Sequence, residues 1–164
     1  MISIIEASTD NDFNQARELF IEYSKSLGIS LEFQNFDEEL KNIPGMYGVL
    51  GGCLLLALDN EQTIGCVALR KIDDNICEMK RLYVLPDWNL QGIGKMLAKS
   101  IIEEAKIRGY RFMRLDTLPA MKRAISLYHS LGFYRIEPYR FNPIEGALYL
   151  ELDLTSFSGS LPLP

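Results

Sequence analysis

The sequence predicts an α/β fold, with a mixed central sheet and helices on both faces, built as one domain over residues 1–154. Three observations predict it. The pattern of apolar and turn residues predicts a strand, two helices and three strands, followed by alternating helices and strands. The length of 164 residues suits one core and leaves little room for a second. Hydrophobic residues make up 48% and charged residues 24% of the chain, which is typical of a globular domain.

The first segments are expected to form a strand and two helices. An apolar run predicts the strand Ile2–Glu6. Asp10 or Asn11 can cap the helix that follows, in which apolar residues recur at helical spacing until Gly28 ends it. A shorter helix is expected over residues 36–43, because a Pro-Gly pair comes directly after it.

The middle of the chain is expected to form a meander of three strands. The apolar runs Cys53–Asp59, 63–72 and Ile76–Val84 have strand length, and short turns rich in Asp and Asn separate them. Pro86 ends the third strand. Residues 87–94 then form a loop that contains glycines and leads into the next helix.

The last segments alternate between helix and strand. The helix after the loop is expected to run to about Arg108, and the strand Phe112–Thr117 follows. Pro119 is expected near the first turn of the next helix. Two further strands are expected over residues 133–137 and 147–154. The remaining residues, 155–164, are rich in Ser, Gly and Pro and are expected to form a flexible tail.

Charge and hydropathy exclude several classes of protein. The net charge is -5 and the pI is about 5.0, whereas a nonspecific binder of nucleic acid or of acidic membranes needs a dense basic face. No apolar run approaches the ~20 residues of a transmembrane helix. The first residues lack the basic and apolar regions of a signal peptide. We therefore expect a cytoplasmic protein without nucleic-acid or membrane partners.

The sequence gives no pattern for a metal site. Cys53, Cys66 and Cys77 all lie in apolar strands, without a CxxC motif or a Cys/His pair, so we expect buried and reduced thiols. His129 is the one histidine of the chain, and one histidine cannot build a cluster. No metal is expected.

The segment 77–94, CEMKRLYVLPDWNLQGIG, carries the clearest chemical signal. It combines a strand, a break at a proline, and a loop that places Gly92 and Gly94 at the N-terminus of a helix. The first N–H groups of a helix have no partner within it, and together with the helix dipole they suit a pyrophosphate. The spacing does not fit the P-loop, and the third glycine of GxGxxG is missing.

Residues 76–133 resemble the GNAT acetyltransferase superfamily, whose signature is a strand, a Q/R-x-x-G-x-G/A loop and a helix. In this sequence NLQGIG takes the place of that loop, with Asn89 where the family usually has Gln or Arg. The resemblance implies the GNAT fold and acetyl-CoA as the acetyl donor. It implies that the following residues bind the cofactor: Leu82, Tyr83, Val84, Asn89, Leu90, Gln91, Gly92, Ile93, Gly94, Lys95, Met121 and Ala124.

A second segment, AISLYHSLGF over residues 124–133, is similar to the family pattern A-x-x-L-Y-x-x-x-G-F. The resemblance implies that the Tyr128 hydroxyl lies near the CoA sulfur and acts as general acid for the leaving thiolate. The alternative is structural, because Tyr128 shares a helix face with apolar residues that would pack on the sheet. Met121 stands where many members have Asn.

Glu78 is a candidate for the catalytic base. Glutamate is disfavoured in the middle of a strand, so this side chain is expected either to face solvent or to have a functional role. An amine must lose a proton before it attacks, and a carboxylate can accept this proton directly or through water. The alternative is an ion pair with Lys80, Arg81 or Lys71 on neighbouring strand positions.

The resemblance implies an acceptor groove between the first helices and the loop before the last strand. Phe33, Tyr47 and Asn142 are the candidate residues there. Acidic residues accompany them, and acidic and aromatic groups together suit a cationic amine. The alternative is a solvated helix face with core aromatics. The acidic residues are Glu32, Asp37, Glu38, Glu39 and Glu145.

A narrower resemblance covers most of the chain from about Phe36 onward. The segments EMKRLYV, LDTLPAMKRAISLYHSLGF and YRFNPIEGALYLELDL are similar to a group of bacterial GNAT proteins without an assigned acceptor. We expect an N-acetyltransferase that moves an acetyl group from acetyl-CoA directly to the amine of a small molecule or peptide. A binding module that senses acyl-CoA without turnover is the alternative, and a homodimer is left open.

Overall fold

The computed structural model describes residues 1–32 and 35–156 and contains one seven-stranded sheet. The strand order is β1-β2-β3-β4-β5-β7-β6. All neighbouring strands are antiparallel except β4 and β5, so the sheet is mixed, as predicted. The strands are β1 (Ile2–Glu6), β2 (Cys53–Asp59), β3 (Gln62–Lys71), β4 (Ile76–Val84), β5 (Phe112–Thr117), β6 (Tyr134–Ile136) and β7 (Leu148–Asp153).

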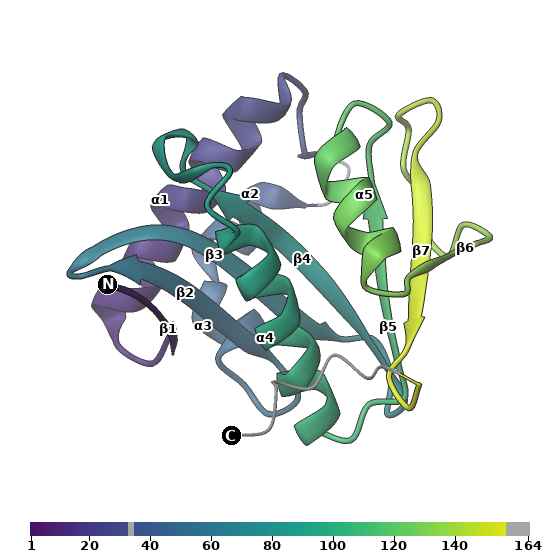
Figure 1. The fold of residues 1–164 in the computed structure, drawn as a ribbon, viewed down its shortest axis with the longest axis horizontal. Coiled ribbons are helices and arrows are strands. Elements are labelled where there is room, and N and C mark those ends of the chain that lie inside the picture. Colours follow the sequence, from purple (N-terminus) through teal and green to yellow (C-terminus); the bar gives the residue numbers. More distant parts are fainter. Residues whose placement is uncertain (33–34, 157–164) are drawn as a thin grey trace.

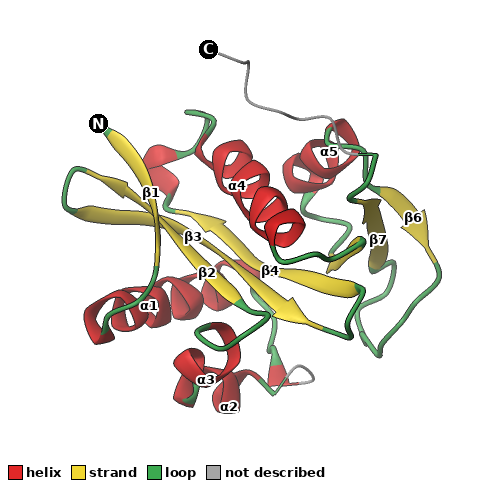
Figure 2. Ribbon diagram, turned by 90° about the horizontal axis from the view of Figure 1, so that it is seen from below, coloured by secondary structure: helices red, strands yellow, loops and turns green. Residues whose placement is uncertain are grey.

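Helices cover both faces of this sheet. Figure 2 shows α1, α2 and α3 on one face and α4 and α5 on the other. The helices are α1 (Asp10–Leu27), α2 (Phe36–Lys41), α3 (Ile43–Tyr47), α4 (Ile93–Ile107) and α5 (Lys122–Ser130), with a 3-10 turn at Pro86–Trp88. None of the helices in residues 1–32 and 35–156 is long and apolar enough to cross a membrane.

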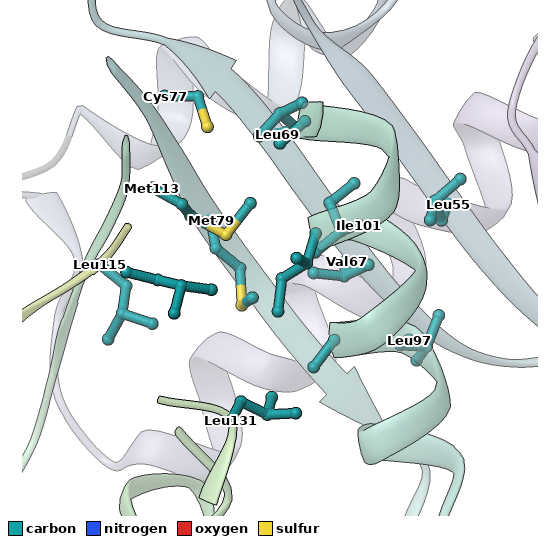
Figure 3. Close-up of a cluster of buried hydrophobic side chains, with 14 of the residues drawn as sticks. Leu55, Val67, Leu69, Cys77, Met79, Leu97, Ile101, Met113, Leu115 and Leu131 are labelled. Atoms are coloured by element: carbon teal, nitrogen blue, oxygen red, sulfur yellow. The ribbon is translucent and has the colours of Figure 1, made fainter. Parts of the chain in front are cut away.

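Two hydrophobic cores lie on the two faces of the sheet. Leu97 and Ile101 of α4 pack on side chains of the central strands, among them Val67 (Figure 3). Phe20 of α1 and Tyr47 of α3 belong to the second core, where their rings meet edge to face with centroids 6.0 Å apart. Strands β2 and β3 contribute to both cores, which explains why they read as continuous apolar runs rather than alternating ones.

The structure corrects the predicted start of α1. The cap is Thr9, and neither Asp10 nor Asn11 takes this role. The Thr9 hydroxyl accepts a hydrogen bond from the Asp12 N–H at 3.1 Å, and the Asp12 carboxylate accepts one from the Thr9 N–H at 3.1 Å. This reciprocal pair is a capping box. Gly28, in a left-handed conformation, ends the helix as predicted.

Two proline assignments were also wrong. Pro44 lies in the first turn of α3, so the helix predicted over residues 36–43 is two short helices separated at Asn42. Pro119 does not open α5. It takes the second position of a turn in which the Met121 N–H bonds the Leu118 carbonyl at 3.0 Å, a position that proline favours. The predicted strands all exist, and their ends differ by at most one residue.

Candidate active site

The site forms where two parallel strands separate. Residues 76–78 of β4 pair with residues 112–114 of β5, and beyond this short ladder the strands spread apart (Figure 1). In Figure 2, α4 and α5 lie over this face of the sheet. The second half of β4 thus turns an edge toward the gap instead of toward a neighbouring strand.

A β-bulge shapes this edge of β4. Lys80 pairs with Ala68, but Tyr83 pairs with Cys66, so β4 holds one residue more than β3 between these two pairs. Arg81 has a φ of 59°, a value that bulky residues rarely adopt. In a regular strand Lys80 and Arg81 would point to opposite faces. At this open edge both residues line the same cavity, together with Met79 and Leu82.

The predicted glycine loop stands at the N-terminus of α4. Gly92 is the N-cap residue with a φ of 78°, and no side chain caps this end of the helix. A Cβ atom at Gly92 would meet nothing within 4 Å, so the space in front of the first turn is open. Trp88 fixes the loop by donating a hydrogen bond to the Asp59 carboxylate at 3.2 Å. The free N–H groups of this turn can therefore bind an anion.

A cleft of about 490 Å³ runs from this loop along β4 to α5. Its volume is in the usual range for a small-molecule site. The cleft brings together every residue predicted to bind the cofactor except Gln91. These are Leu82, Tyr83, Val84, Asn89, Leu90, Gly92, Ile93, Gly94, Lys95, Met121 and Ala124.

Sequence reasoning missed several residues of this cleft. Tyr23 and Ser26 of α1 line it, although nothing in the sequence links α1 to the loop. Arg123 and Leu127 of α5 also line it. The spacing of Met121, Ala124 and Leu127 could have identified Leu127, since residues three apart share a helix face.

A second, narrower cavity, which we call the chamber, adjoins the cleft. The two share Tyr23, Leu82 and Met121. Tyr128 lines the chamber, is 6% exposed, and packs edge to face on Phe133 with ring centroids 5.6 Å apart. Burial, and then the nearby Tyr23 and Asp116, raise the pKa of Tyr128. The hydroxyl therefore stays protonated at neutral pH and can donate a proton.

The far wall of the chamber comes from the loop between β6 and β7. Arg140 donates a hydrogen bond to Asp116 Oδ1 at 2.7 Å, and Asn142 Nδ2 donates one to Asp116 Oδ2 at 3.0 Å. Burial alone would raise the pKa of Asp116, but the charge and hydrogen bond of Arg140 outweigh it and lower the pKa. The predicted acceptor residue Asn142 thus lies in the chamber wall.

Glu78 lies behind the chamber wall. Its side chain is fully buried, and it does not belong to the lining of the chamber or the cleft. Tyr139 donates a hydrogen bond to Oε2 at 2.7 Å, and Arg140 lies 3.5 Å from the same oxygen. Oε1 lies 3.2 Å from Arg70 and 3.8 Å from Lys80. Of the predicted partners, Arg81 pairs with Glu39 and Lys71 with Asp74 instead. These contacts favour the ion-pair alternative over direct contact with an acceptor.

Glu78→Gln is therefore expected to lower the free energy of unfolding by about 3 kcal/mol, because the surrounding cations lose their common counter-charge. Urea unfolding measures this loss. The profile of kcat/KM against pH is expected to keep its shape. A stable variant whose kcat falls at neutral pH and recovers at high pH would instead identify Glu78 as the base.

Two other predicted acceptor residues do not meet the chamber. Phe33 lies outside the described residues. Tyr47 is a core residue, 1% exposed, whose pKa is raised by burial and then by Glu39, and it does not line the chamber. The acidic surroundings are absent as well, because none of Glu32, Asp37, Glu38, Glu39 and Glu145 lines the chamber. These residues therefore give the chamber no acidic lining, and the site for a cationic amine stays a prediction.

The three cysteines are free and buried, as predicted. Cys53 lies within 4.8 Å of Glu6 and Glu104, a grouping that could in principle hold a metal ion. Burial raises the pKa of the Cys53 thiol to about 12, and Arg108 pairs with both carboxylates. A protonated thiol beside neutralised carboxylates is a poor set of ligands.

The chain is similar to known acetyltransferases over most of its length. The model of the acetyltransferase (GNAT) family matches residues 13–133. An uncharacterised N-acetyltransferase of Schizosaccharomyces pombe is 40% identical over 156 residues, which cover 94% of this chain and 96% of the relative. One of Dictyostelium discoideum is 31% identical, with 87% and 94% covered. The resemblance to bacterial proteins thus extends to eukaryotes.

Solved acetyltransferase structures share this fold. A GNAT family acetyltransferase from Elizabethkingia anophelis, solved with acetyl-CoA bound, superposes with a TM-score of 0.63 at 25% identity, covering 93% of this chain and 97% of that one. The chain therefore belongs to the GNAT family of acetyltransferases, as its sequence predicted.

Proposed function

We propose that this protein transfers an acetyl group from acetyl-CoA directly to the amine of a small molecule or peptide. The observation that carries the proposal is the junction of the cleft and the chamber at Tyr23, Leu82 and Met121. The cleft suits the donor, because it is long, largely apolar and ends at an open helix N-terminus. A thioester at the junction would face the chamber from which an acceptor arrives.

The residues of the cleft fit acetyl-CoA. The first-turn N–H groups of α4 would hold the pyrophosphate, and the absence of a side chain at Gly92 leaves room for it. Backbone groups of Leu82, Tyr83 and Val84 would hydrogen-bond the amide-bearing arm, as an open strand edge binds a peptide. When bound, acetyl-CoA supplies an activated acetyl group whose leaving group is a thiolate.

Direct transfer is supported by the lining of the chamber. A covalent acetyl-enzyme needs a nucleophile such as a cysteine thiolate. None of the chamber residues in the described part of the chain is a cysteine, and burial raises the pKa of Cys66 and Cys77 so that both stay protonated. Three free thiols also support a reducing compartment such as the cytoplasm.

Tyr128→Phe is expected to lower kcat by about 10²–10⁴-fold, the usual contribution of a general acid. Thermal stability should change little, because Tyr128 donates no hydrogen bond to any residue that the structure describes. The control is Tyr110→Phe, which removes another buried hydroxyl, one that donates to the Gly51 carbonyl at 2.6 Å. This control is expected to lower the melting temperature and to leave kcat unchanged. If Tyr128→Phe instead lowers the melting temperature and leaves kcat unchanged, Tyr128 is a core residue.

The proposal is tested by following thiol release from acetyl-CoA in the presence of amines, amino acids and peptides. A catalyst releases CoA with at least one class of acceptor, and the acetylated product is detected by mass. The alternative, an acyl-CoA sensor, binds acetyl-CoA and leaves it intact with every acceptor. The hydroxyl of Tyr128 in the chamber favours the catalyst, since a sensor has no use for a proton donor at this place.

A further inference from the structure

The walls of the chamber carry more basic than acidic groups. Lys80, Arg81 and Arg140 line the chamber, against the single carboxylate of Asp116. Behind them, Glu39 pairs with Arg81, and Glu78 lies near Lys80 and Arg140 and also pairs with Arg70. We call these seven residues the chamber network. It holds four basic side chains and three carboxylates.

The carboxylates of the chamber network are already bound. Both oxygens of Glu39 accept hydrogen bonds from Arg81, at 2.9 and 2.7 Å. Both oxygens of Asp116 accept hydrogen bonds from Arg140 and Asn142. Glu78 is shared among three cations and Tyr139, as described above. Its Oε1 accepts no hydrogen bond from a described residue, but Glu78 does not line the chamber, so this oxygen is not exposed to a ligand there.

The surplus positive charge falls on Lys80. Its side chain is 4% exposed, and the nearest carboxylate oxygen, Glu78 Oε1, lies 3.8 Å away. Within residues 1–32 and 35–156 its Nζ makes no hydrogen bond. Burial, and then the charge of Arg81, lower the pKa of Lys80 to about 7, although Glu78 opposes the shift. Asp116, Glu39 and Arg140 are the other charged groups that act on Lys80.

A buried ammonium whose nearest carboxylate oxygen lies 3.8 Å away and is shared with Arg70 is poorly stabilised, and a ligand anion can relieve this. We infer that the acceptor carries a carboxylate, and that Lys80, in the chamber between Arg81 and Arg140, binds it. The inference rests on the proposed function and narrows its acceptor to amines such as amino acids. A carboxylate is small enough for this narrow chamber, and Arg140, which lines it, has a buried Nε that lacks an acceptor among the described residues.

The test compares matched acceptors that differ in one charge. Glycine, glutamate and phenylalanine are assayed for thiol release beside their α-carboxamides. An amide has the less basic amine, so more of it is unprotonated at neutral pH, and chemistry alone would favour it. Charged hydrogen bonds of this kind are commonly worth a factor of about 10–100, and we expect kcat/KM to favour the acid by that factor. Equal or higher kcat/KM for the amides would overturn the inference.

Two variants separate recognition from proton transfer. Lys80→Met removes the charge and is expected to raise KM for the acid until acid and amide are alike. Lys80→Arg keeps a cation that cannot accept a proton, and is expected to keep the preference for the acid. If Lys80→Arg instead loses kcat for both acceptors as completely as Lys80→Met, Lys80 accepts the amine proton and the inference is wrong.

A binding measurement that needs no turnover keeps this test apart from the proposed function. With CoA present, N-acetylglycine is expected to raise the melting temperature of the wild type more than N-acetylglycinamide does, and this difference should vanish in Lys80→Met. If the difference is found but no acceptor releases thiol, the carboxylate site stands and catalysis fails. If the acid and amide products stabilise the wild type equally, the carboxylate site is refuted.

Discussion

Gly92→Asp is expected to abolish binding of acetyl-CoA, because it places an anion where the pyrophosphate would meet the first turn of α4. The open space at Gly92 means that the new side chain clashes with no described residue. An aspartate at a helix N-terminus also interacts favourably with the helix dipole, so the variant should remain folded. The lost affinity would therefore come from repulsion of the ligand, and isothermal titration against acetyl-CoA measures it.

Gly109→Asp is the matched control for this change. Gly109 follows the other end of α4, has a φ of 85°, and has no atom within 4 Å of its Cβ position, so both variants carry the same backbone penalty. Near a helix C-terminus an aspartate is unfavourable. Gly109→Asp should therefore be the less stable of the two and should still bind acetyl-CoA. Comparable affinities of both variants would show that the loop does not hold the pyrophosphate.

Glu39→Ala is expected to lower the free energy of unfolding by about 3–5 kcal/mol, because it leaves the charge of Arg81 buried without a partner. Glu39 is 2% exposed and Arg81 5% exposed. The guanidinium also lies against the rings of Tyr23 and Phe36, with its central carbon 5.9 and 5.3 Å from their centroids, so it cannot swing out without losing these contacts. Urea unfolding of both proteins gives the difference.

The neighbouring residue supplies the control. Glu38 is 79% exposed and lies 3.7 Å from Lys41, and surface pairs of this kind contribute about 0–1 kcal/mol. Glu38→Ala should thus be close to wild type. Equal losses of unfolding free energy in Glu38→Ala and Glu39→Ala would refute a stabilising role for the buried Glu39–Arg81 pair.

The cost of Glu39→Ala should also depend on pH. Burial by itself would raise the pKa of Glu39, but the hydrogen bonds and charge of Arg81 outweigh it and hold the pKa below the ordinary 4.5. A carboxyl group with a depressed pKa in the folded state stabilises the fold above its unfolded pKa and loses this effect as the pH falls through the folded value. The difference between wild type and variant should therefore be full at neutral pH and shrink in acid.

The strands and the glycine loop could be predicted because their signals are local. Apolar runs between Asp- and Asn-rich turns placed the strands to within a residue at each end. The loop was recognisable because Gly92 and Gly94 stand between a proline-ended strand and an amphipathic helix. The Pro119 turn was missed since proline suits both a helix start and the second position of a turn.

The charge of the chamber could not be predicted, because it depends on contacts between distant segments. Glu39 and Arg81 are 42 residues apart, and Asp116 and Arg140 are 24 apart. Sequence composition near the expected groove was acidic, whereas the fold turns these acidic groups to solvent or pairs them. The bulge at Arg81 was equally hidden, and so was the position of Arg81 beside Lys80 in the chamber lining.

The central claim is that acetyl-CoA binds along the edge of β4 and the start of α4. Hydrogen–deuterium exchange with and without acetyl-CoA tests it most directly, since bound ligand slows exchange of the amides it covers, whatever the acceptor. We predict slower exchange in peptides that contain residues 82–84 and 92–96, at the cleft. Unchanged exchange there, or protection confined to the groove lined by Gly51, Gly52 and Arg108 at the C-terminal end of α4, would contradict this account.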